Sequence, residues 1–87
     1  MKLSAFAFES ASGEWVAQCV EHDITVSADC FELLQKKFRR EVMGHILVNE
    51  KLGRKGLDGI PALPEPFRSV FQAAKDLFYV ITVEVDD

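Results

Sequence analysis

The side chains best suited to chemistry lie in one short stretch, where Cys19, Glu21, His22 and Asp23 occur within five residues. Thiols, imidazoles and carboxylates bind zinc, and together they can form a nucleophile with its general base. Strand geometry separates them, because Cys19 and Glu21 point to one face and His22 points to the other unless the turn rotates it. Catalytic sets are also usually assembled from separated segments of a chain. The sequence therefore favours a buried Cys19 beside a solvated acidic turn over a metal site or a catalytic set.

A run of basic residues at positions 36–40 is the second candidate for function. On a helix such a run normally forms the solvent-facing side. The functional alternative is a contact surface for nucleic acid or for an acidic partner. The residues concerned are Lys36, Lys37, Arg39 and Arg40. No phosphate-binding loop, metal-binding spacing or cofactor motif accompanies them, so we expect no catalytic residue, metal or cofactor.

Length and composition predict one globular domain over residues 1–87, since 48% of the residues are apolar and 28% are charged. The net charge of −4 disfavours DNA binding, which relies on a basic surface that neutralises phosphates. No apolar run is long enough to span a membrane, and the N-terminus does not resemble a signal peptide. We therefore expect a cytoplasmic protein with free thiols at both cysteines.

Three strands are predicted before the first helix, at residues 2–8, 14–21 and 24–28. The first link contains Gly13 and the second is the acidic turn at 21–23. Links this short predict an antiparallel meander.

A long amphipathic helix should follow, with Asp29 as its N-cap and Glu32 completing a capping box. Steps of three and four place one apolar stripe on a single face: Phe31, Leu34, Phe38, Val42 and Ile46. The helix should end near residue 51, with Gly53 as the stop. Gly44 lies inside this helix and lowers its stability by about 1 kcal/mol relative to alanine. A close backbone contact at this position would explain the glycine.

The last third of the chain predicts a glycine- and proline-rich loop at 53–66, a short helix at 65–75 and a strand at 77–85. This strand is apolar on both faces until Glu84, so we expect a central strand or a dimer contact. Its candidate partner-binding residues are Tyr79, Ile81 and Val83. The predicted fold class is α+β with the order β-β-β-α-α-β: a meander, a long helix, a short helix and a final strand completing the sheet.

Residues 15–24, Trp-Val-Ala-Gln-Cys-Val-Glu-His-Asp-Ile, followed by Ala28 and Asp29, resemble the HicB-like antitoxin family. The proline-led segment 63–67, running on to Ala73 and Ala74, is similar to the short helix of the compact, stand-alone members. The resemblance covers nearly the whole chain. It implies a partial ribonuclease-H-like fold, and the sequence lacks the acidic metal-binding set of true ribonuclease H enzymes.

In this family the domain typically docks on a small ribonuclease toxin of the HicA type and blocks its RNA-binding or catalytic surface. The resemblance therefore implies a non-catalytic protein-interaction domain with a small basic toxin as partner. Many members add a C-terminal DNA-binding domain, for which the residues after 85 leave no room, so we expect no autorepression through DNA. Two alternatives stay open: a stand-alone regulatory or structural homodimer, and an enzyme built around Cys19 and His22.

Overall fold

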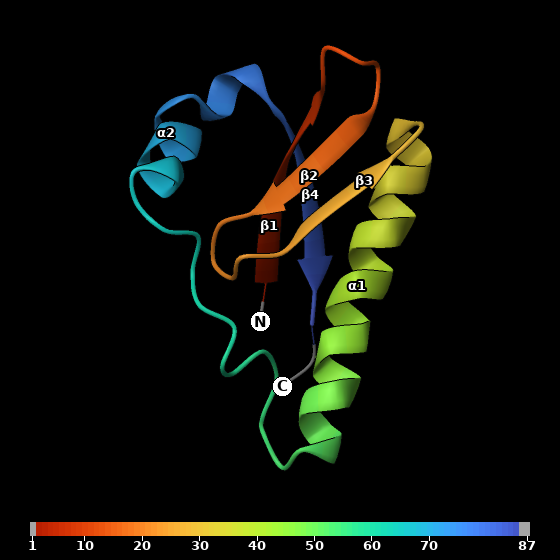
Figure 1. Ribbon diagram of the computed structural model, residues 1–87, viewed down its shortest axis with the longest axis vertical. Helices are drawn as coiled ribbons and strands as arrows, with labels where there is room; N and C mark the ends of the chain where they lie inside the picture. Colours follow the sequence, from red (N-terminus) through yellow and green to blue (C-terminus); the bar gives the residue numbers. More distant parts are fainter. Residues whose placement is uncertain (1, 86–87) are drawn as a thin grey trace.

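Four antiparallel strands form a single sheet in the order β3-β2-β1-β4. The structure is a computed structural model that describes residues 2–85 (Figure 1). Its α+β class and its element order confirm the prediction from the sequence. The strands are β1 (Lys2–Glu9), β2 (Trp15–Cys19), β3 (Thr25–Ala28) and β4 (Tyr79–Glu84). The first three form the predicted meander, and β4 returns to pair with β1.

The position of β4 corrects one prediction, because β4 is an edge strand and not a central one. It pairs antiparallel with β1, with Ala5 opposite Ile81, and within residues 2–85 no strand lies on its outer side. The face of β4 toward the long helix carries Tyr79, Ile81 and Val83, and its opposite face carries Val80, Thr82 and Glu84. Ile81 and Val83 are buried beneath the long helix, whereas Val80 is exposed on the opposite face.

One face of the sheet is covered by α1 (Phe31–Lys51). Four residues of the predicted stripe are buried against the sheet, and Phe31 is half-buried beside them; the buried four are Leu34, Phe38, Val42 and Ile46. Small side chains from the sheet, Ala5, Ala7 and Ala17, are fully buried there and let the helix approach closely. This layer holds the main hydrophobic core.

The two ends of α1 differ in how well the sequence predicted them. The N-cap is Cys30, one residue later than expected, and no side chain caps the first turn, so the capping box at Asp29 and Glu32 is wrong. Leu34 N–H donates to Cys30 O and starts the helix. The C-terminal end is as expected, since Gly53 adopts a φ of 77°, which L-residues rarely occupy.

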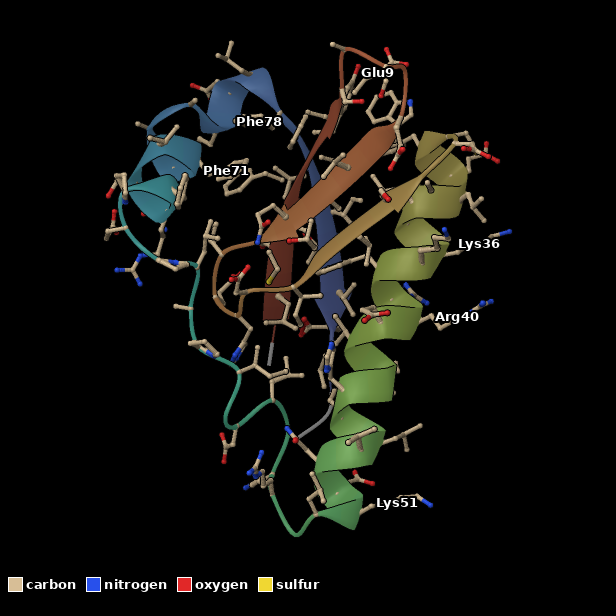
Figure 2. The ribbon with its side chains drawn as sticks, viewed as in Figure 1. Glu9, Lys36, Arg40, Lys51, Phe71 and Phe78 are labelled. Carbon is tan, nitrogen blue, oxygen red and sulfur yellow. The ribbon has the colours of Figure 1, made fainter. Side chains whose placement is uncertain are left out.

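The opposite face of the sheet is only partly covered, by α2 (Phe67–Ala73) and the short 3₁₀ helix η1 (Lys75–Leu77). The predicted helix at 65–75 is therefore shorter than expected. Phe71 stacks on Phe6 with ring centroids 5.8 Å apart, and Phe78 lies 5.3 Å from Phe71. Figure 2 shows Phe71 and Phe78 between α2 and the sheet. This aromatic cluster fixes α2 over the β1–β4 half of the sheet.

The loop at 53–66 is tied down by α1 and by the turn between β2 and β3. Asn49, a buried residue of α1, donates from Nδ2 to Gly56 O (2.9 Å) and to Asp58 O (3.0 Å). Leu57 and Leu63 are buried from within the loop. These contacts order a long segment that has no regular secondary structure.

Across residues 2–85, no helix combines the length and the apolar character needed to cross a bilayer.

Candidate protein-interaction surface

Cys19, the first member of the reactive cluster, is fully buried on the core side of β2. Its Sγ donates to Glu21 Oε1 over 3.4 Å. Burial is the main cause that raises the pKa of the Cys19 thiol to about 11, and the charge of Glu21 adds to it. Because the thiolate is the nucleophile and the metal ligand, Cys19 is an inert thiol near neutral pH.

The neighbours of Cys19 serve as structural contacts. His22 is half-buried, and its Nδ1 lies 2.7 Å from Ile60 O, a distance at which the ring N–H donates to the carbonyl. Asp23 N–H donates to Pro61 O over 2.7 Å. Glu21 accepts from Ser4 N–H at 3.3 Å. The sequence predicted a solvated turn. In the structure the turn also holds the loop at 53–66 against the sheet.

Within the described part of the chain, residues 2–85, no group of three or more His, Cys, Asp or Glu side chains could hold a metal ion.

The raised pKa of Cys19 makes stability depend on pH above the ordinary thiol range. The folded state keeps its proton up to about pH 11, whereas the unfolded chain loses it near pH 9, so the folded state binds more protons in between. The free energy of unfolding should therefore fall as pH rises from 9 to 11, by about 1–3 kcal/mol. Urea unfolding of the wild type and of Cys19→Ala at several pH values measures the effect. An equally steep fall in Cys19→Ala would contradict it.

A buried glutamine on the open face was not foreseen from the sequence. Gln18 accepts from Thr25 Oγ1 over 2.6 Å and donates to Asp23 Oδ1 over 3.1 Å and to the Cys19 carbonyl over 2.9 Å. Every polar atom of its amide group is therefore paired, so the network stabilises the β2–β3 turn and leaves no unpaired group for a ligand.

The four basic candidates at positions 36–40 of α1 are exposed, as a partner-binding role requires. Figure 2 shows Lys36 and Arg40 pointing away from the sheet. Lys36 and Arg39 line a shallow groove of about 290 Å³ between α1 and β4. Lys37 lies on the other side of the helix, where its Nζ donates to Ser27 O of β3 over 3.1 Å.

The three candidates on β4 share one face of the strand but differ in exposure. Ile81 and Val83 are buried in the core, at 4% and 3% exposure, so in the folded chain their side chains cannot contact a partner. Tyr79 is 63% exposed and packs against the rings of Trp15 and Phe31. Strand alternation places all three on the α1 face of β4, and Tyr79, the first residue of the strand, stays exposed there.

Ten large apolar side chains are exposed among residues 2–85, five on α1 and its C-cap and five from α2 to β4. We call the second set the α2–β4 surface; its members are Phe67, Val70, Leu77, Tyr79 and Val80. Tyr79 and Val80 lie on opposite faces of β4. The set borders the outer edge of β4, where alternate backbone N–H and C=O groups lack a neighbouring strand. Exposed apolar groups beside an open edge are typical of a surface that binds another protein. Tyr79 was the only one of the five proposed from the sequence.

The two sheet edges differ in how they are protected. β3 has four residues, and its Ser27 carbonyl accepts from Lys37 of α1. β4 has six residues, and no charged side chain bonds to its backbone in the contacts described for residues 2–85. Short edge strands and lysine side chains both oppose strand addition, so β4 is the more open edge.

Charge is divided unevenly between the helix and the rest of the chain. Residues 31–55 hold seven basic and three acidic residues, a net charge of +4. The remaining residues hold three basic and eleven acidic ones, a net charge of −8. Residues 67–84, which carry the α2–β4 surface, hold two basic and two acidic residues, so the acidic excess lies elsewhere in the chain. Val80 lines the same groove as Lys36 and Arg39 of α1.

Comparison with known protein families, with curated proteins and with solved structures finds no match to this chain. The fold and the surface define an α+β domain with one helix-covered sheet face, one partly open face and one open edge.

Proposed function

We propose that this chain is a non-catalytic protein-binding domain of the HicB antitoxin type, which acts in the cytoplasm and neutralises a small basic ribonuclease toxin by docking on it. The observation that carries the proposal is the α2–β4 surface, with its exposed apolar side chains beside the open edge of β4. Apolar groups supply affinity, and an open edge can pair with a strand of the partner.

The acidic residues outside α1 support a basic partner. A ribonuclease binds a polyanion and therefore presents a basic substrate site. The residues outside 31–55 carry a net charge of −8, which would attract such a site over a long range. The basic residues of α1, with Lys36 and Arg40 among them, would repel the same toxin, so we place the toxin contact on the sheet side.

The reactive cluster supports a non-catalytic role. Cys19 is a buried thiol with a raised pKa, and His22 is engaged with Ile60 O. Neither group is available to a substrate in this arrangement.

Co-expression tests the proposal in cells. Each small basic protein encoded beside this gene is produced from an inducible promoter, alone and with this chain, and growth and bulk RNA are followed. We expect growth arrest and RNA decay in the first case and normal growth in the second. A growth arrest that this chain does not relieve, or the absence of toxicity from every neighbouring product, would overturn the proposal.

A further inference from the structure

One side of α1 carries a glycine that nothing within the chain explains. A methyl group placed at Gly44 would meet no atom within 4 Å among residues 2–85, so the close backbone contact expected from the sequence is absent within the chain. Glycine is among the poorest helix formers, and alanine would fit the same space. A close approach by a second molecule would account for it.

The residues around Gly44 lie on one line along the helix. Steps of four and three residues join five positions, which we call the Gly44 face: Lys37, Glu41, Gly44, Val48 and Lys51. This is the spacing by which one helix packs against another in a coiled coil. A hollow of about 540 Å³ opens at its centre, lined by Arg40, Glu41, Gly44, His45 and Val48. Val48 protrudes beside the hollow and is 57% exposed.

The shape and the charges of the Gly44 face on one copy complement those of the same face on a second copy. If two copies of α1 pack antiparallel about a two-fold axis midway between Gly44 and Val48, each Val48 enters the hollow at Gly44 of the other copy. The same register brings Glu41 of each copy to Lys51 of the other. Two apolar contacts are then flanked by two opposite-charge pairs, as an isologous interface requires.

We infer that the Gly44 face is the interface at which two copies of this chain associate. The Arg- and Lys-rich first half of α1 then lies at the two ends of the contact, opposite the C-terminal end of the other copy's α1. In Figure 1 the second half of α1 continues beyond the end of β3, which leaves this part of the helix accessible. The α2–β4 surface belongs to other elements, so the inference does not depend on a toxin.

A charge swap tests the inference. Glu41→Lys places like charges together twice in the dimer, and Lys51→Glu does the same, so each should weaken association about tenfold. The double variant restores two opposite-charge pairs and should associate within about twofold of the wild type. Glu41 and Lys51 are about 15 Å apart along one helix, too far to pair within a chain, so a rescue can arise only between copies.

The measurement is sedimentation equilibrium from about 1 µM to about 1 mM, the range in which a contact of this kind should dissociate. Glu50→Lys is the matched control, because it makes the same charge change at an exposed position of α1 outside the Gly44 face. It should leave association unchanged. Gly44→Leu should fill the hollow and abolish the dimer while helical circular dichroism is retained. A 9.8 kDa monomer at every concentration, or a dimer whose weakening the double variant does not rescue, would overturn the inference.

Discussion

Phe38→Ala is expected to lower the free energy of unfolding by about 3–5 kcal/mol. Phe38 is fully buried at the centre of the layer between α1 and the sheet, where it is the largest fully buried side chain among residues 2–85. Its removal leaves a cavity that the small residues beneath it, such as Ala7 and Ala17, cannot fill. A domain of this length has only about 4–13 kcal/mol of stability in total, so a large part of it would be lost.

Urea unfolding followed by circular dichroism measures this loss. Met43→Ala is the matched control, since Met43 lies on the same helix and is 44% exposed. Its effect should stay within about 0.5–1 kcal/mol. A loss of less than about 1 kcal/mol in Phe38→Ala would contradict the placement of α1 over the sheet.

Val80→Arg is expected to weaken binding of the proposed toxin about 100-fold, an effect typical of a central interface residue. Val80 is 53% exposed, and it lies opposite Phe6 on the partly open face beside the β4 edge. An arginine there adds a positive charge that faces a basic partner. Its aliphatic stem can still cover the apolar neighbours, so the fold should be retained.

Met43→Arg is the matched control for this prediction, because it also places an arginine at an exposed apolar position, on α1 and outside the Gly44 face. Calorimetric titration of the purified partner with both variants should show weak binding for Val80→Arg and wild-type binding for Met43→Arg. Equal affinities of the two variants for the partner would contradict the placement of the toxin contact on the α2–β4 surface.

Local spacing was sufficient to predict most of the fold. The steps of three and four that join Leu34, Phe38 and Val42 report the buried side of α1 directly, and Gly53 marks its end. The short links between β1, β2 and β3 similarly force an antiparallel meander. These features depend on residues that are close together in the sequence, so one sequence is enough to predict them.

Long-range pairing was the part that the sequence did not reveal. Whether β4 lies at the centre or at an edge depends on which strand it meets, and residues 77–85 are apolar in either case. The same holds for Ile81 and Val83, whose burial depends on the side that α1 covers. Asn49 and His22 are paired with loop carbonyls 7 to 38 residues away, so their structural role was hidden as well.

The candidate surface was predicted only in part for a related reason. The basic residues of α1 are conspicuous in the sequence, but their charge is opposite to what a basic toxin requires. The exposed residues Val70 and Leu77 look like core positions in a linear pattern. They belong to α2 and η1, the elements that cover the second sheet face, and neither element buries a residue.

The most direct test of the proposed function is an RNA cleavage assay in which each small basic protein encoded beside this gene is purified and titrated with this chain. We expect cleavage to fall in proportion to the added chain and to stop near a one-to-one ratio, with Val80→Arg failing to inhibit at that ratio. Unchanged cleavage at a large excess of the folded wild-type chain would contradict the account.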